Sequence, residues 1–379
     1  MTCSLRERYG GFRIRYLVSG TDLTPVHNGQ NGVVAHRKVV PTMKSTRIVL
    51  ASRPIGMPEQ ENFRTETVEL EPPKAGEALL QTLYLSLDPY MRGRMSDAPS
   101  YAPPVAVGDT MCGATVSRVV ESADPALRPG DIVLGYGGWQ THSVEPVAGL
   151  RKLDPALAPL TTALGVLGMP GMTAYSGLLT IGQPKPGETV VVAAATGPVG
   201  ATVGQIAKIK GARAVGIAGG PRKVALLRER FGFDAAVEHR APDFAEQLAA
   251  ATPDGIDVYF ENVGGPVFDA VLPRLNPFAR IPVYGLIANY NDTELPPGPD
   301  RLPLLMSNIL RKSLTVRGYI MTEFLNQAGE FYPAAAQWIA EGKLAYLEDV
   351  VDGLDRTVDA FQGRLTGKNL GKLVIKVSD

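Results

Sequence analysis

The stretch ETVVVAAATGPVGATVGQIAKIKGARAVGIAGG, residues 188–220, decides the fold of this chain. It begins with an apolar, β-branched run and continues through small residues to Gly197 and Gly200. Apolar side chains then recur every three or four positions over residues 199–209, as on one face of a helix. A second apolar run follows at 214–218. The stretch therefore predicts a βαβ unit, whose helix N-terminus can bind a diphosphate.

The composition is that of a globular protein, and a length of 379 residues predicts two domains. Basic and acidic residues are equal at 38 each, so we expect neither nucleic acid nor a membrane as a partner. The two cysteines, Cys3 and Cys112, have no paired spacing, which argues against a disulfide framework. No apolar run approaches the length of a membrane span. We therefore expect a cytoplasmic protein.

Residues 1–42 differ from the rest of the chain because they show no sustained periodicity. They lack the continuous apolar core of a secretory signal. Their arginines would suit a transit peptide, but Glu7 and Asp22 count against one. We interpret this segment as a disordered extension or as the result of an early start codon, with Met43 as the functional start.

Short apolar runs separated by Pro and Gly follow, a pattern typical of a β-rich, barrel-like domain. The predicted strands are residues 47–51, 63–70, 78–87, 115–120 and 131–134. Strands and helices then alternate, which predicts a doubly wound parallel sheet. A long helix is expected over residues 323–341, and a last strand over 370–377 returns to the first domain. We assign residues 43–168 and 331–379 to the β-rich substrate-binding domain and residues 169–330 to the cofactor-binding domain.

The glycine turn lacks the first glycine of the dinucleotide fingerprint, because Ala195 stands there. Its place between a strand and a helix still favours cofactor binding over a purely structural turn. An NAD site carries an acidic residue after the second strand, where this chain has two glycines followed by Pro221, Arg222 and Lys223. Two cations without an acid favour NADP(H), although both could simply be solvated residues at a helix start.

Metal ligands are not evident, since none of the histidines has a ligand spacing to a cysteine, carboxylate or second histidine. These histidines are His27, His36, His142 and His239. We therefore expect no metal site and a reaction assisted by hydrogen bonds. Tyr290 follows a predicted strand at 280–284, at the edge of the sheet where ligands bind. It could donate a hydrogen bond to an oxyanion or to the cofactor ribose, or it could pack as a loop aromatic.

In combination these motifs resemble the zinc-free medium-chain dehydrogenase/reductase superfamily. The resemblance is greatest to the prostaglandin reductase and leukotriene 12-hydroxydehydrogenase group, which includes bacterial NADPH-dependent alkenal and curcumin reductases. It extends from about residue 43 to 377, and residues 1–42 have no counterpart. It is carried by LDPYMRG (87–93), GMPGMTAY (168–175), AATGPVG (194–200), YFENVGG (259–265), YGLIANYN (284–291) and KNLGK (368–372).

The resemblance implies a Rossmann domain joined to a GroES-like catalytic domain, assembled as a homodimer. It implies an enzyme that uses NADPH to reduce the C=C bond of α,β-unsaturated ketones and aldehydes, without zinc. The hydride would pass from nicotinamide C4 to the β-carbon. Tyr290 and the ribose 2′-hydroxyl would stabilise the enolate, and Tyr90 would face the same cleft from the other domain.

The resemblance also implies a set of cofactor-binding residues. The diphosphate would contact Gly197, Pro198, Val199 and Gly200, and the 2′-phosphate would contact Lys223. His239 replaces a tyrosine that is usual at the 2′-phosphate; imidazole can also donate to phosphate, more strongly when protonated, so the preference for NADPH can be kept. The rest of the cofactor would lie along Asn262, Tyr284, Gly285, Leu286, Ile287, Tyr290, Tyr319, Ile320, Met321 and Asn369.

Other functions fit the same scaffold. A zinc-free quinone reductase or alcohol oxidoreductase is one alternative, and a non-catalytic NADPH-binding sensor is another. The substrate pocket depends on loops at residues 94–104 and 291–305. The second loop is rich in proline and long enough to act as a lid.

Overall fold

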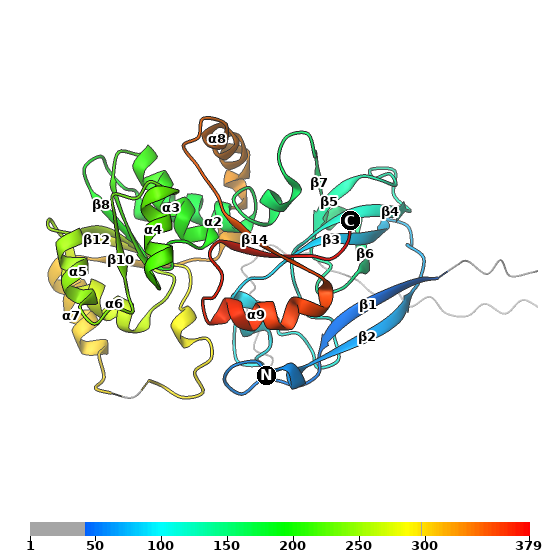
Figure 1. The fold of residues 1–379 in the computed structure, drawn as a ribbon, viewed down its shortest axis with the longest axis horizontal. Helices are drawn as coiled ribbons and strands as arrows, with labels where there is room; N and C mark the ends of the chain where they lie inside the picture. Colours follow the sequence, from blue (N-terminus) through cyan, green and yellow to red (C-terminus); the bar gives the residue numbers. More distant parts are fainter. Residues whose placement is uncertain (1–41, 297) are drawn as a thin grey trace, which may run out of the picture. The chain divides into compact units, whose positions relative to one another are not determined.

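The computed structural model describes residues 42–296 and 298–379, which form two lobes (Figure 1). The β-rich lobe contains strands β1–β7, β14 and β15, and the parallel-sheet lobe contains β8–β13. The expectations for residues 1–41 lie outside the described part of the chain. Within the described residues, no helix combines the length and the apolar character that crossing a membrane requires.

In the described part of the chain, the parallel-sheet lobe holds six parallel strands in the order β10-β9-β8-β11-β12-β13. The chain order reverses between β8 and β11, and ligands of such sheets bind at this switch point. The doubly wound parallel sheet predicted from the sequence is confirmed. Its strands are β8 (Thr189–Val192), β9 (Arg213–Ala218), β10 (Ala235–Glu238), β11 (Ile256–Phe260), β12 (Leu275–Val283) and β13 (Thr315–Gly318).

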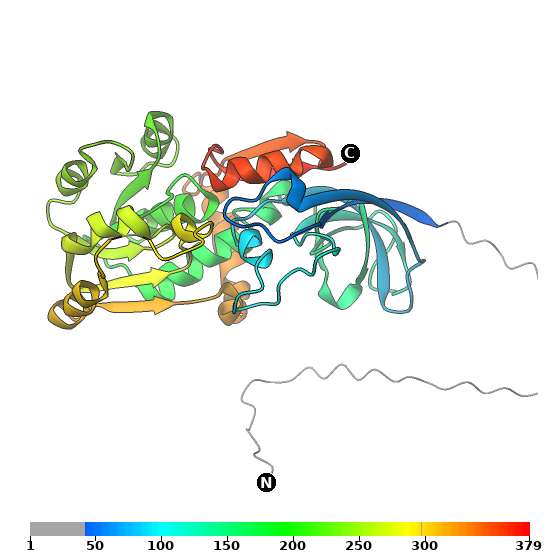
Figure 2. The ribbon, with the colours of Figure 1, turned by 90° about the horizontal axis from the view of Figure 1, so that it is seen from below.

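Helices cover both faces of this sheet because successive side chains of a strand point to opposite faces (Figures 1 and 2). Val190 and Val192 of β8 pack in one core with α2, α3, α4 and α8. Val191 packs in the other core with α5, α6 and α7. The helices are α2 (Met169–Ser176), α3 (Pro198–Ile209), α4 (Pro221–Glu229), α5 (Phe244–Ala251), α6 (Gly265–Val271), α7 (Leu302–Lys312) and α8 (Ala328–Ala340).

Both ends of the described chain contribute to the β-rich lobe, where β15 pairs antiparallel with β3 and parallel with β14. Its core centres on Trp139, whose ring stacks on Phe63 and meets Phe361 edge-on, each at 5.5 Å between ring centroids. The elements are β1 (Met43–Leu50), β2 (Phe63–Leu70), β3 (Glu77–Ser86), α1 (Tyr90–Arg94), β4 (Thr115–Ser122), β5 (Ile132–Gly135), β6 (His142–Pro146), β7 (Arg151–Leu153), β14 (Glu348–Asp352), α9 (Thr357–Leu365) and β15 (Lys372–Lys376).

The structure differs from the sequence prediction in two helical regions. The long helix expected over 323–341 is a 3-10 turn at Met321–Gln327 followed by α8. Phe331 and Ala335 of α8 are buried in the core of the parallel-sheet lobe, although we assign residues from 331 onward to the β-rich domain. The chain therefore returns to the β-rich lobe after α8. Helix α7 also occupies the end of the segment expected to be the loop 291–305.

Gly204 tests the close packing of α3. A Cβ on Gly204 would lie 2.0 Å from the Phe233 ring, so Gly204→Ala should overpack this core and lower the free energy of unfolding by about 1–3 kcal/mol. Gly329 of α8 is the matched control, because a Cβ there meets nothing within 4 Å. Gly329→Ala should be neutral or stabilising by up to about 1 kcal/mol. Urea unfolding of both variants measures the difference, and equal stability would contradict the packing argument.

Candidate functional site

A cleft of about 470 Å³ lies between the two lobes, at the carboxyl ends of the parallel strands. Both lobes line it, and the lining includes Tyr90 and most of the cofactor residues predicted from the sequence. Those residues are Gly197, Pro198, Val199, Gly200, Asn262, Tyr284, Gly285, Ile287, Tyr290, Ile320 and Met321. A space of this size can hold an extended cofactor segment together with a small substrate.

The turn between β8 and α3 forms one end of the cleft. Gly197 is the N-cap of α3, so the free N–H groups of the first helical turn point toward the cleft. A Cβ on Gly200 would lie 2.6 Å from the carbonyl oxygen of Ala194, so this position requires glycine. Ala195 replaces the expected first glycine without conflict, because its methyl group is fully buried in the core. The turn is therefore built for an anion despite its shortened motif.

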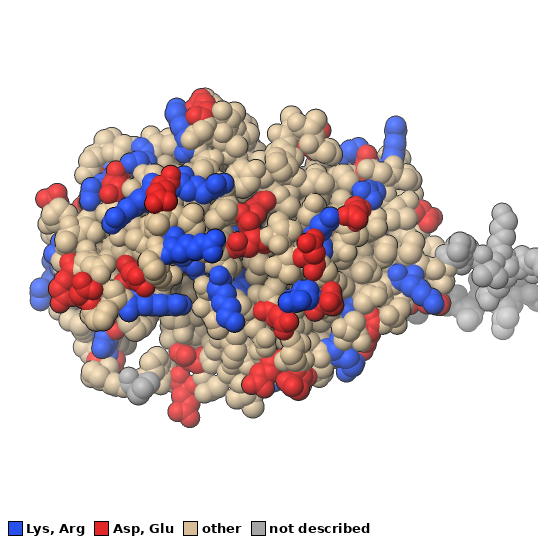
Figure 3. Space-filling model, viewed as in Figure 1, with Lys and Arg blue, Asp and Glu red and all other residues tan. Residues whose placement is uncertain are grey.

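Cations gather where β9 and β10 end. Nζ of Lys223, on α4, donates to the carbonyl oxygen of Gly367 at 2.7 Å, and Nη2 of Arg240 lies 3.5 Å from that of Thr366. Burial, followed by the charges of Arg364 and Arg240, lowers the pKa of Lys223 to about 8. Burial and the neighbouring cations also lower the pKa of His239. On the face drawn in Figure 3 basic and acidic side chains are interspersed, so this grouping is a local feature.

Asn262 lies in the turn after β11 and lines the cleft. Its Nδ2 donates to the carbonyl oxygen of Ala193 at 3.0 Å, while its Oδ1 is buried and has no partner among the described residues. The preceding Glu261 fixes this turn by accepting the backbone N–H groups of Val263 and Gly264 at 2.6 and 2.8 Å. The orphaned Oδ1 is an acceptor that a cofactor amide or hydroxyl group can satisfy.

Two tyrosine hydroxyls face the cleft from different lobes. Tyr290 follows the 3-10 turn Ile287–Asn289, and its hydroxyl lies 3.2 Å from the place that a Cβ on Gly285 would take. Burial raises the pKa of Tyr290. Tyr90 begins α1, and burial followed by the charge of Asp88 raises its pKa. Both hydroxyls therefore remain protonated at neutral pH and can donate hydrogen bonds.

Some predicted residues lie outside the cleft lining. The Tyr319 hydroxyl donates to the carbonyl oxygen of Thr173 at 2.8 Å, so this side chain belongs to the core beneath the cleft. Leu286 is 43% exposed and packs beside Gly264. Asn369 borders the cleft through Arg364, whose Nη1 lies 3.4 Å from its Oδ1. Lys223 and His239 lie in the cation cluster described above.

A buried ion pair supports the wall that carries Tyr90. Lys372 of β15 donates to Oδ1 of Asp88 at 2.6 Å, to Oγ of Ser86 at 2.6 Å and to the carbonyl oxygen of Leu87 at 3.3 Å. The two charged side chains are only 3% and 8% exposed. This pair fixes the start of α1 relative to the C-terminal strand.

The sequence analysis missed several residues that line the cleft. Arg364 precedes the KNLGK motif in the sequence, but it belongs to no motif that would identify it as a site residue. It reaches the cleft because it lies on α9. The others include Arg94 of α1, Tyr101 of the loop after it, Tyr136 after β5, Met169 at the start of α2 and Thr322 after β13.

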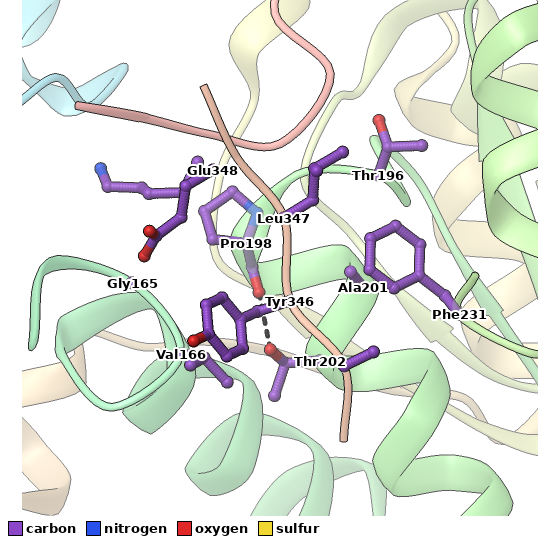
Figure 4. A pocket seen from close by; sticks show the side chains of 12 residues that line it. Gly165, Val166, Thr196, Pro198, Ala201, Thr202, Phe231, Tyr346, Leu347 and Glu348 are labelled. Atoms are coloured by element: carbon purple, nitrogen blue, oxygen red, sulfur yellow. Dashed lines mark hydrogen bonds between the residues drawn. The ribbon is translucent and has the colours of Figure 1, made fainter. Parts of the chain in front are cut away.

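A second, much smaller cavity lies behind the start of α3 (Figure 4). Its volume of about 10 Å³ leaves room for roughly one water molecule. Thr202 donates to the carbonyl oxygen of Pro198 at 2.8 Å, and Thr161 donates to Oε2 of Glu348 at 2.7 Å. Oε1 of Glu348 is buried and lacks a partner among the described residues. This cavity is too small for a cofactor, which leaves the larger cleft as the candidate site.

Among the described residues, no group of three or more His, Cys, Asp and Glu side chains could hold a metal ion. His142 lies on β6 beside Thr141, away from the cleft lining, and His239 lies near Arg240 and Lys223. The expectations for His27 and His36 fall outside the described residues.

The cleft does fit a nicotinamide dinucleotide. A helix N-terminus and a cation cluster match its phosphate groups. Gly200 allows the start of α3 to pack closely on the backbone of Ala194, and the orphaned Asn262 oxygen offers an acceptor in the cleft.

Comparison with known proteins agrees with this geometry. Residues 46–153 match the family described as the N-terminal domain of oxidoreductase, and residues 198–341 match the family described as zinc-binding dehydrogenase. NADPH-dependent curcumin reductase of Escherichia coli (strain K12) is 57% identical over 336 residues, which cover 88% of this chain and 97% of the relative. Prostaglandin reductase 1 of Rattus norvegicus is 43% identical over 85% of this chain and 95% of its own length.

A solved structure is also similar. The crystal structure of CurA in complex with NADPH from Vibrio vulnificus superposes with a TM-score of 0.85 at 51% identity, covering 88% of this chain and 99% of that one. The chain belongs to the zinc-free medium-chain dehydrogenase/reductase superfamily, in the group of the prostaglandin and curcumin reductases.

Proposed function

We propose that this protein uses NADPH to reduce the C=C bond of α,β-unsaturated ketones and aldehydes. The observation that carries this proposal is the cleft itself, whose lining combines the glycine turn at the start of α3 with Tyr90 and Tyr290 from the two lobes. The similarity to NADPH-dependent curcumin reductase supports the same cofactor and reaction.

Residues of the parallel-sheet lobe would hold the cofactor. The N-terminus of α3 would bind the diphosphate, and Gly200 allows the tight turn that precedes this helix end. Lys223 and His239 would bind the 2′-phosphate, and Asn262 would accept a hydrogen bond further along the groove. When bound, NADPH supplies the hydride that the β-carbon of the substrate receives.

The protein groups act on the charge that develops at the substrate carbonyl oxygen. Tyr290 would donate a hydrogen bond to that oxygen and stabilise the enolate, and Tyr90 would face the same oxygen from the other lobe. Such preorganised donors stabilise developing charge more strongly where water is excluded. Because burial raises the pKa of both tyrosines, each stays a donor rather than becoming a base. A proton then reaches the α-carbon from water or from a tyrosine.

NADPH oxidation against an enone, an enal, a quinone and a secondary-alcohol/ketone pair tests this function. We expect turnover with the enone and enal, with products in which the C=C bond is reduced and the C=O bond is kept. Turnover of the quinone alone, reduction of C=O, or tight NADPH binding without any turnover would each contradict the proposal.

Tyr290→Phe tests the role of its hydroxyl. Loss of one hydrogen bond to the enolate should lower kcat for an enone by about 10²–10³-fold while the Kd of NADPH is maintained. Tyr84→Phe is the control, because Tyr84 of β3 lies outside the cleft lining. An unchanged kcat in Tyr290→Phe would remove this hydroxyl from the mechanism.

Lys223→Ala tests the assignment of the 2′-phosphate. Removing a charged hydrogen-bond donor should raise the Kd of NADPH by about 10–100-fold and leave the Kd of NADH nearly unchanged. The ammonium form binds the phosphate, so the affinity of the wild type for NADPH is full below pH 8 and falls as the pH rises above the Lys223 pKa of about 8. The affinity for NADH should lack this pH dependence. Lys210→Ala, at the exposed C-terminal end of α3, is the control.

We also propose a division of labour between the lobes, with most of the cofactor held by residues 169–330 and the substrate enclosed by residues 43–168 and 331–379. The segment of α8 beyond residue 330 would then support the cofactor-binding core on which it packs. A fragment of the parallel-sheet lobe that includes all of α8 should bind NADPH, although more weakly than the whole chain, and a complete loss of binding would count against this division.

We also propose that the protein is a homodimer located in the cytoplasm. All residues of β13 are exposed at the edge of the parallel sheet, and unpaired strand edges favour pairing with another chain. Apolar side chains of the neighbouring α7 are also exposed, including Leu310 at 81% and Met306 at 55%. A solution mass equal to one chain, or recovery with membranes after cell fractionation, would contradict this assignment.

A further inference from the structure

The side chain of Arg364 reaches the cleft from the lobe opposite the phosphate turn. It belongs to α9, which lies beside the junction of the two lobes (Figures 1 and 2). It lines the cleft together with Gly197, and its Nη2 lies 3.9 Å from the place that a Cβ on Gly197 would take. The guanidinium group therefore faces the N-terminus of α3 across the cleft.

This guanidinium group is poorly satisfied by the described residues. Its hydrogen-bond partner is Oδ1 of Asn369, at a long distance of 3.4 Å from Nη1. The nearby carboxylates are already used: Asp349 accepts the backbone N–H groups of residues 370 and 371, and Asp88 pairs with Lys372. Several N–H donors of Arg364 are thus free to bind another group.

The surroundings of Arg364 are unfavourable for a lone cation. A helix N-terminus carries partial positive charge, which repels a guanidinium group beside it. Lys223 and Arg240 add further positive charge, and the proximity of Arg364 contributes to the low pKa of Lys223. Burial also lowers the pKa of Arg364 itself, and the carboxylates of Asp88 and Asp349 offset only part of this effect. An anion placed between the helix end and the guanidinium group would reverse this repulsion.

We propose that Arg364 is a ligand of the cofactor diphosphate, which would lie between its guanidinium group and the N-terminus of α3. The 2′-phosphate is the other candidate anion. Gly197 begins the diphosphate turn, however, and the charge of Arg364 acts on both Lys223 at the 2′-phosphate end and Tyr290 at the reacting end. Arg364 thus lies between the 2′-phosphate end and the reacting end. In a dinucleotide the diphosphate is the anionic group between these two ends.

The proposal gives the β-rich lobe a direct share in holding the cofactor. With α3 on one side and α9 on the other, the diphosphate would join the two lobes. This inference rests on dinucleotide binding and is independent of which substrate is reduced, so its test can succeed even if enone reduction fails.

Titrations of NADPH and NADH with Arg364→Leu test the inference, since both cofactors carry the diphosphate. We expect the Kd of both to rise by a similar factor of about 10–100-fold. Arg364→Lys keeps the positive charge but lacks the planar guanidinium group with its paired N–H donors. Its affinity for both cofactors should therefore fall less than that of Arg364→Leu. Arg356→Ala, at the exposed start of the same helix, is the control and should bind as the wild type does.

Thermal unfolding separates a ligand-binding role from a structural one. Without cofactor, Arg364→Leu should unfold at the same temperature as the wild type or higher, because repulsion at the helix end is removed. NADPH should raise its Tm less than it raises that of the wild type.

Wild-type affinity in Arg364→Leu would overturn the proposal. A loss confined to NADPH would also overturn it, because Arg364 would then bind the 2′-phosphate. If Arg364→Leu fails to fold, Arg364→Lys decides: wild-type Kd values for both cofactors would overturn the assignment, and a shared increase would support it.

Discussion

The buried ion pair between Lys372 and Asp88 is the constraint on which the cleft depends. It joins residues 284 positions apart in the chain, and almost no solvent reaches it. Removing two charges from water is costly, and the cost is offset only when their remaining hydrogen bonds are made. Ser86 and the carbonyl group of Leu87 complete those bonds for Lys372. These contacts hold the start of α1, which carries Tyr90, in one position relative to β15.

The same C-terminal segment reaches the other end of the cleft. The turn between α9 and β15 provides the carbonyl group of Gly367 to Lys223, and α9 provides Arg364. Cations from both lobes therefore meet near the start of α3, and tyrosines from both lobes line the cleft. Neither lobe alone contains the complete lining.

Local patterns predicted much of this structure. The βαβ unit, the parallel sheet and the return of the last strand are confirmed, because apolar periodicity and glycine position act over a few residues. The strands β6, β7 and β14 were missed, since they are short and their pairing with β3, β5 and β15 defines them. Tyr319 was expected beside the cofactor, but its hydroxyl is bound to the backbone of α2. The sequence alone does not show whether an aromatic side chain points into the cleft or into the core.

The sequence by itself determined the strand, the glycine turn and the helix at residues 188–220, and the absence of an acid after β9. Those features depend on neighbours along the chain, where steric and hydrogen-bonding preferences act directly. Only the tertiary structure decided that Lys372 pairs with Asp88 and that Arg364 faces the start of α3. These contacts join distant segments, and their charges interact only because folding brings them together in a buried space that water no longer screens.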